Sequence, residues 1–132
     1  MNEQLNILIY GASYGMLLGS KLLKSGHNVH LIGVKDEVDL INSDGIYVSI
    51  PDRKSKEDIL LHSKSLYGKL TASTPENINV SNFQIVFLAM QEFQYKEKEL
   101  KKSILEIAKL KIPTVSIMNI PPHAFLKNFS KI

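Results

Sequence analysis

The sequence predicts an α/β domain with a mostly parallel sheet and helices on both of its faces. Three observations support this fold class. A strand, a leucine-faced helix and a second strand follow one another within residues 5–33, as in the strand–helix–strand unit of parallel sheets. A further buried strand is predicted at residues 84–90, followed by an amphipathic helix and another strand. The chain of 132 residues, 44% of them apolar, is large enough to bury one core.

The N-terminal unit is defined by a change in the period of its apolar residues. Residues 5–10 (LNILIY) form an apolar run without alternation, which is typical of a strand covered on both faces. From Ser13 to Lys24 the leucines recur at helical spacing, and Gly26 is placed to end this helix in the left-handed conformation. Residues 28–33 (NVHLIG) predict the second strand.

The middle of the chain predicts shorter elements. Residues 36–42 favour a short helix, residues 43–45 (SDG) a turn, and residues 46–50 (IYVSI) an alternating strand. Residues 51–67 are polar, and we expect them to contain a loop that decorates the domain. Residues 68–74 predict one more short strand.

The C-terminal third repeats the strand–helix–strand pattern. Residues 84–90 (QIVFLAM) predict a buried strand, residues 93–109 an amphipathic helix and residues 112–119 the next strand. A double proline then ends the regular structure. We therefore expect one domain over residues 1–120, with residues 121–132 starting a connection or a final helix toward a second domain.

Composition excludes several classes of function. The net charge of +3 is small and the basic residues are scattered, so a nucleic-acid partner is not predicted. Without cysteine there is no disulfide, no thiolate nucleophile and no cysteine-ligated metal site, and the four histidines show no metal-ligand spacing, so no metal is predicted. The uncharged run at residues 4–20 is interrupted by Asn6 and by glycines, and Glu3 stands where a secretory signal has basic residues. We expect a cytoplasmic protein that does not enter a membrane.

The turn after the first strand resembles a phosphate-binding glycine turn. In the G-x-G-x-x-G pattern the glycines provide a tight turn, close approach to a pyrophosphate, and close packing of the helix on the strand. Gly11 is placed for the first task and Gly15 for the third, whereas Ser13 or Tyr14 stands at the place of the middle glycine. The turn therefore predicts a Rossmann-like dinucleotide site, and the alternative is a strand-to-helix turn that binds nothing.

The order of the segments resembles one family. ILIYGA, G.LLG..L..SGH.V.LIG, INSDGIYV, FLAMQEFQ and SIMN follow one another as in the N-terminal domain of the ketopantoate reductases (2-dehydropantoate 2-reductases), over residues 6–119. This resemblance implies a Rossmann domain that binds NADPH. It also implies a second, mostly helical domain that supplies the catalytic lysine and most of the substrate pocket.

The resemblance carries individual residues with it. Val34 stands where the family has an arginine for the 2′-phosphate of NADP, and Lys35 beside it is a candidate point charge for that phosphate. Asp36 would instead repel a 2′-phosphate or accept a hydrogen bond from a free ribose hydroxyl. Gln91 replaces the family's lysine near the nicotinamide, and Asn119 is retained at the end of the following strand. The predicted cofactor-binding residues are Gly11, Ala12, Ser13, Tyr14, Gly15, Val34, Lys35, Ala89, Met90, Gln91 and Asn119.

The function implied by the resemblance is hydride transfer from NADPH to a small α-keto acid. We expect NADP as the cofactor, with NAD as the alternative, and we assign no catalytic residue to this chain. Activity is expected only with a second domain, and the partners considered are the α-keto acid, a helical domain and a second copy of the chain. Two other functions remain open: a non-catalytic module that binds or senses a nucleotide, and the N-terminal domain of an opine-type dehydrogenase.

Overall fold

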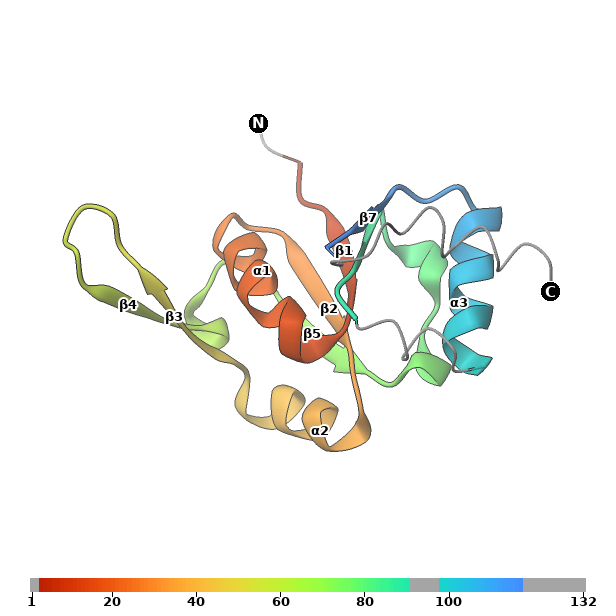
Figure 1. Cartoon of the computed structure of the whole chain (residues 1–132), viewed down its shortest axis with the longest axis horizontal. Helices are drawn as coiled ribbons and strands as arrows, with labels where there is room; N and C mark the ends of the chain where they lie inside the picture. Colours follow the sequence, from red (N-terminus) through yellow and green to blue (C-terminus); the bar gives the residue numbers. More distant parts are fainter. Residues whose placement is uncertain (1–2, 91–97, 118–132) are drawn as a thin grey trace.

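The computed structural model describes residues 3–90 and 98–117, and it confirms the predicted fold class. Five parallel strands form one sheet in the order β5-β2-β1-β6-β7, and a separate pair, β3 and β4, forms a second sheet (Figure 1). The strands of the main sheet are β1 (Asn6–Tyr10), β2 (Asn28–Ile32), β5 (Leu70–Ser73), β6 (Ile85–Leu88) and β7 (Thr114–Ser116). This is a Rossmann-like arrangement, in which the first strand lies in the middle of the sheet.

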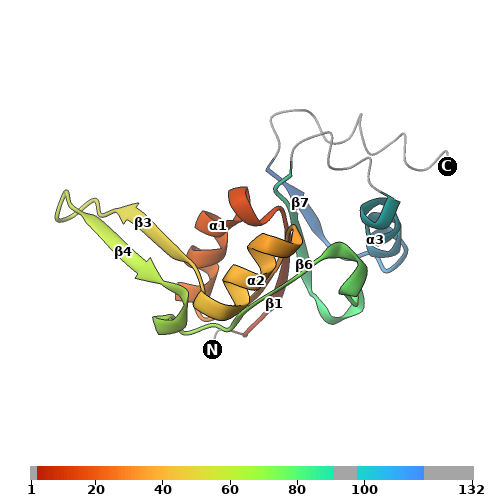
Figure 2. The same cartoon turned by 90° about the horizontal axis from the view of Figure 1, so that it is seen from below.

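Helices cover both faces of the main sheet. Helix α1 (Ala12–Lys24) and helix α2 (Lys35–Asp44) lie on one face, and helix α3 (Lys98–Lys109) lies on the other (Figure 2). Strand β1 contributes Ile7 and Ile9 to the core under α1 and α2, and Leu8 and Tyr10 to the core under α3. Because both faces of β1 are buried, its sequence is apolar without alternation.

The ends of these elements agree with the sequence to within a few residues. Helix α1 ends at Lys24, and Gly26 just beyond it adopts the left-handed conformation that the sequence predicted, with φ of 96°. Strand β7 is shorter than the predicted strand over residues 112–119, part of which lies outside the described residues. The predicted helix over residues 93–109 begins, within the described residues, at Lys98.

Residues 51–67, which we expect to contain a decorating loop, also contain a strand that was not predicted. Residues Asp58–His62 form strand β4, which pairs antiparallel with β3 (Tyr47–Pro51) in a hairpin that projects from the domain (Figure 1). The register puts Val48, Ile50, Ile59 and Leu61 on one face of this hairpin. Apolar residues at alternate positions favour a strand here, and residues 52–57 form the charged tip of the hairpin.

Short 3-10 turns replace a helix between β5 and β6. These turns span Pro75–Asn77 and Val80–Asn82. Val80 is fully buried and joins the core under α3, so this connection still covers part of that face. No helix within the described residues has both the length and the apolar character to span a bilayer.

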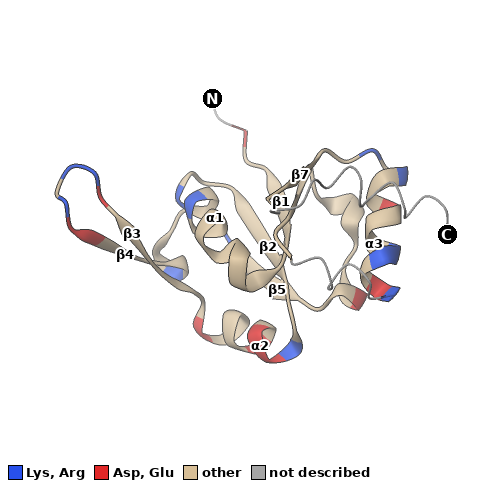
Figure 3. Cartoon of the chain, in the orientation of Figure 1, with Lys and Arg blue, Asp and Glu red and all other residues tan. Residues whose placement is uncertain are grey.

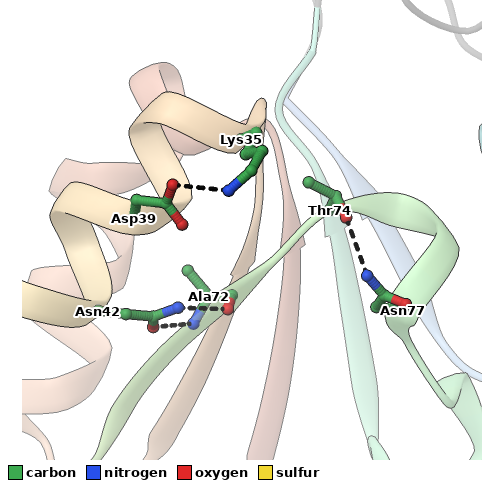
Figure 4. Close-up of polar contacts among 6 residues, drawn as sticks. All are labelled: Lys35, Asp39, Asn42, Ala72, Thr74 and Asn77. Carbon is green, nitrogen blue, oxygen red and sulfur yellow. Dashed lines mark hydrogen bonds and ion pairs between the residues drawn. The ribbon is translucent and has the colours of Figure 1, made fainter.

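Strand β5 lies at the edge of the main sheet, and α2 occupies that edge. The Asn42 side-chain amide donates a hydrogen bond to the Ala72 carbonyl oxygen over 2.9 Å (Figure 4). The Ala72 N–H in turn donates to the Asn42 Oδ1 over 3.0 Å. One side chain thus satisfies both backbone groups of an edge residue, as a neighbouring strand would.

Candidate functional site

The candidate site lies where the chain leaves β1 and β6 in opposite directions. These two strands are neighbours in the sheet, but α1 follows β1 on one face and α3 follows β6 on the other. In open α/β sheets, ligands bind at the carboxyl ends of the strands beside such a switch point. Gly11 follows β1 at this place, and Ala89 and Met90 follow β6.

Gly11 permits the turn between β1 and α1. Its φ is 99°, a left-handed conformation that strongly favours glycine. A Cβ on Gly11 would lie 2.4 Å from the carbonyl oxygen of Ala89, so the turn passes directly against the end of β6. The Gly11 N–H donates to the carbonyl oxygen of Ile32 over 2.9 Å, which also ties the turn to the end of β2. The first predicted task of the glycine turn, a tight turn, therefore falls on Gly11.

Gly15 allows α1 to pack closely on β1. A Cβ on Gly15 would lie 2.6 Å from Cγ2 of Ile9, too close for any side chain. One helical turn later, a Cβ on Gly19 would lie 3.5 Å from Cγ1 of Val29, which is an ordinary van der Waals contact. Close packing of the helix on the strand therefore depends on Gly15 and much less on Gly19.

The N-terminus of α1 presents backbone N–H groups at the switch point. The first hydrogen bond of the helix runs from the Gly15 N–H to the Gly11 carbonyl oxygen over 2.8 Å, so the N–H groups of residues 12–14 precede it. No side chain of the described residues caps this helix, and its first turn contains no acidic residue. These N–H groups and the helix dipole favour an anion such as phosphate.

A cavity of about 470 Å³ opens in front of these N–H groups. Its volume lies within the range of small-molecule sites. The cavity is formed by four parts of the fold: the turn after β1, the segment after β2, the segment after β5, and one side of α3 with the end of β6. Its lining residues are Gly11, Ala12, Ser13, Tyr14, Ile32, Gly33, Val34, Lys35, Glu37, Thr74, Pro75, Glu76, Met90 and Leu100. Tyr14 is one of these lining residues and is 63% exposed.

The charged residues of the cavity are mostly acidic. Glu37, in the first turn of α2, accepts a hydrogen bond from the Ser13 hydroxyl over 2.8 Å. Glu76 lines the cavity from the segment after β5. Lys35 is the single cation among the described lining residues, and its Nζ donates to Asp39 over 2.8 Å (Figure 4). The hydrogen bond to Asp39 and the charge of that carboxylate raise the pKa of Lys35. In Figure 3 the start of α2 is blue, for a basic residue, and red acidic positions adjoin it along the helix.

The cavity brings together part of the predicted cofactor-binding set. Gly11, Ala12, Ser13, Tyr14, Val34, Lys35 and Met90 line it. Gly15 and Ala89 lie beneath, where Gly15 packs on Ile9 and the backbone of Ala89 contacts Gly11. Gln91 and Asn119 lie outside the described residues.

The parts of the cavity lining that were not predicted from the sequence include Glu37 on α2, residues 74–76 and Leu100 on α3. Asp36 was the expected acid near the ribose, but Asp36 is exposed and Glu37, one residue later, lines the cavity. Helical phase decides this, because consecutive residues of a helix point about 100° apart. Residues 74–76 were also missed, since their only sequence signal is the Thr-Pro turn after a short strand.

No protein-family model matches the chain, and no curated protein sequence matches it. The geometry of the cavity is therefore the observation on which a function is proposed.

Proposed function

We propose that this chain is the dinucleotide-binding domain of an oxidoreductase and that it holds NAD(P) across the carboxyl ends of β2, β1 and β6. The observation that carries the proposal is the open cavity in front of the uncapped N-terminus of α1. The backbone N–H groups of residues 12–14 would hold the pyrophosphate. Val34 and Pro75, from the segments after β2 and β5, would enclose the adenosine half, and Met90 would lie toward the nicotinamide.

The bound dinucleotide supplies hydride transfer, and the protein supplies binding and orientation. The resemblance to the ketopantoate reductases supports a small α-keto acid as the hydride acceptor and a second, helical domain as the source of the catalytic groups. The isolated chain is accordingly expected to bind the dinucleotide and to turn over ketopantoate negligibly.

A non-catalytic nucleotide-binding module is the second candidate, and one observation favours it. Among the described residues of the cavity, Lys35 is the single cation, and it is paired with Asp39. The described part of the site thus offers no unpaired positive group for the carboxylate of an α-keto acid. A sensing module would bind ADP or AMP about as tightly as a dinucleotide, whereas a dehydrogenase domain gains affinity from the nicotinamide half.

Titration of the purified chain with NADH, NADPH, ADP and AMP tests the proposal. We expect a reduced dinucleotide to bind in the micromolar range, followed by the fluorescence of its nicotinamide ring. Equal affinities for ADP and the dinucleotide would favour the sensing module, and no binding of any of the four would refute both candidates.

A matched pair of variants at Tyr14 places the binding on the N-terminus of α1. Tyr14→Glu adds a carboxylate to the first turn of α1. This carboxylate interacts favourably with the helix dipole but repels a pyrophosphate. Tyr14→Gln makes nearly the same change in shape without the charge. We expect Tyr14→Glu to weaken dinucleotide binding by about tenfold or more relative to Tyr14→Gln, with both variants folded. Equal affinities of the two variants would place the phosphates elsewhere.

A further inference from the structure

Glu37 occupies a fixed position between the phosphate turn and the end of β2. Its Oε1 accepts the hydrogen bond from the Ser13 hydroxyl over 2.8 Å. Its Oε2 lies 3.0 Å from the point where a Cβ on Gly33 would stand, so the carboxylate uses the space that this glycine leaves free. Val38, the next residue, is buried in the core and anchors this turn of α2. The carboxylate is thus held in the wall of the cavity by neighbours on both sides.

An ionised carboxylate in this position has a defined preference among ligands. It accepts hydrogen bonds and donates none. The free 2′- and 3′-hydroxyls of a ribose can both donate to such a group, whereas a 2′-phosphate brings a second negative group to the same wall. Repulsion between like charges at close distance discriminates strongly between two such ligands.

The other charges of the cavity do not offset this preference. Glu76 adds a second carboxylate from the segment after β5. Lys35 is turned along the outside of α2 toward Asp39, and its side chain is 78% exposed (Figure 4). A lysine in this arrangement must give up an ion pair to meet a 2′-phosphate, and it lacks the two-pronged hydrogen bonding of an arginine.

We propose that Glu37 makes this site selective for a dinucleotide with a free 2′-hydroxyl, NAD(H), over NADP(H). This inference rests on the proposed dinucleotide function and narrows it. It departs from the NADPH preference that the family resemblance implies, because the residue that decides the preference is Glu37 and the family's arginine position holds Val34.

The test compares the dissociation constants of NADH and NADPH for three proteins. The wild-type chain is expected to bind NADH at least about tenfold more tightly than NADPH. Glu37→Gln keeps the shape of the side chain and removes its charge, so we expect it to bind NADPH more tightly than wild type and to lose most of the preference. Asp36→Asn is the matched control, since it removes the same charge from the adjacent, exposed residue, and its preference is expected to equal that of wild type.

The outcomes separate this inference from the function on which it rests. If the wild-type chain binds NADPH as tightly as NADH, or more tightly, the inference is overturned and the dinucleotide site stands. The inference is also overturned if Glu37→Gln and Asp36→Asn change the preference for NADH over NADPH equally. The preference would then depend on the net charge of the protein and not on the position of Glu37. If neither dinucleotide binds to the wild-type chain, the proposed function fails as well. The ratio of the NADH and NADPH dissociation constants of the wild-type chain tests the inference even if a variant does not fold.

Discussion

The two sheets of this protein differ in how they are stabilised. Each face of the main sheet is covered by helices, and Leu8, Ile9 and Tyr10 of its central strand are completely buried. The β3–β4 hairpin carries one apolar face, while Leu60 on its other face is 68% exposed. A two-stranded hairpin has little stability of its own. The candidate site therefore lies on the sheet that is buried on both faces, and the hairpin is an attachment to that sheet.

Truncation of one leucine in each sheet is expected to affect the stability of the protein very differently. Leu8→Ala leaves a cavity in the core under α3 and is expected to cost about 2–5 kcal/mol of the free energy of unfolding. Leu60→Ala removes an exposed side chain and is expected to cost less than about 0.5 kcal/mol. Urea denaturation followed by circular dichroism measures both. Similar losses in the two variants would mean that the hairpin is part of the same cooperative core.

Two glycines of α1 differ in how closely they approach the main sheet. Gly15→Ala places a methyl group 2.6 Å from Cγ2 of Ile9 and is expected to destabilise the protein by about 1–3 kcal/mol through overpacking. Gly19→Ala meets only an ordinary contact, so the gain in helix propensity is expected to leave the stability unchanged or raised by up to about 1 kcal/mol. Urea denaturation midpoints of the two variants compare their stabilities. A Gly15→Ala variant more stable than Gly19→Ala would contradict the close approach of α1 to Ile9 at Gly15.

The edge of the main sheet provides a third contrast. Asn42→Asp removes the donor to the Ala72 carbonyl oxygen and sets a carboxylate against it, which is expected to cost about 1–3 kcal/mol. The control is Asn77→Asp, because Asn77 is exposed and bonds the Thr74 hydroxyl over 3.4 Å (Figure 4); its expected effect is within about 0.5 kcal/mol. Thermal unfolding of the two variants measures the difference. Equal effects would show that Asn42 does not protect the edge strand.

The smallest expected effect concerns His30 on β2. Its ring nitrogens lie 2.6 Å from the Thr71 hydroxyl and 2.8 Å from the Ser73 hydroxyl. Burial lowers the pKa of His30 below its ordinary value of 6.5. A lowered pKa in the folded state means that the contribution of His30 to stability is complete above pH 6.5 and is lost as the pH falls through the folded-state pKa. His30→Gln is expected to reduce this loss, measured as the free energy of unfolding between pH 7.5 and pH 5; an unchanged pH dependence would contradict it.

The main sheet could be predicted from sequence because its strands are buried on both faces. Residues 5–10 and 84–90 are apolar without interruption, and the leucines between Ser13 and Lys24 have a helical period. The hairpin could not be predicted in full, because its second strand, Asp58–His62, follows a highly charged tip and carries apolar residues on a partly exposed element.

The candidate site also contains residues that could be predicted from the sequence and residues that could not. The glycine turn was visible because Gly11 and Gly15 are required by a left-handed turn and by a close contact, and these are local properties of the chain. Glu37 and Glu76 were not visible, because only the tertiary fold brings α2 and the segment after β5 to the same cavity. Asp36 and Glu37 are adjacent in sequence, and only the orientation of the helix decides which carboxylate enters the cavity.

In the function proposed above, the backbone N–H groups of residues 12–14 hold the pyrophosphate of a dinucleotide. The most direct measurement is the change in the amide chemical shifts of the ¹⁵N-labelled chain on addition of NADH. The account predicts that the largest shifts fall on Ala12, Ser13 and Tyr14, with further changes at Gly33 and Val34 and none on the hairpin. Saturating NADH that leaves these amides unmoved, or that shifts the hairpin instead, would contradict it.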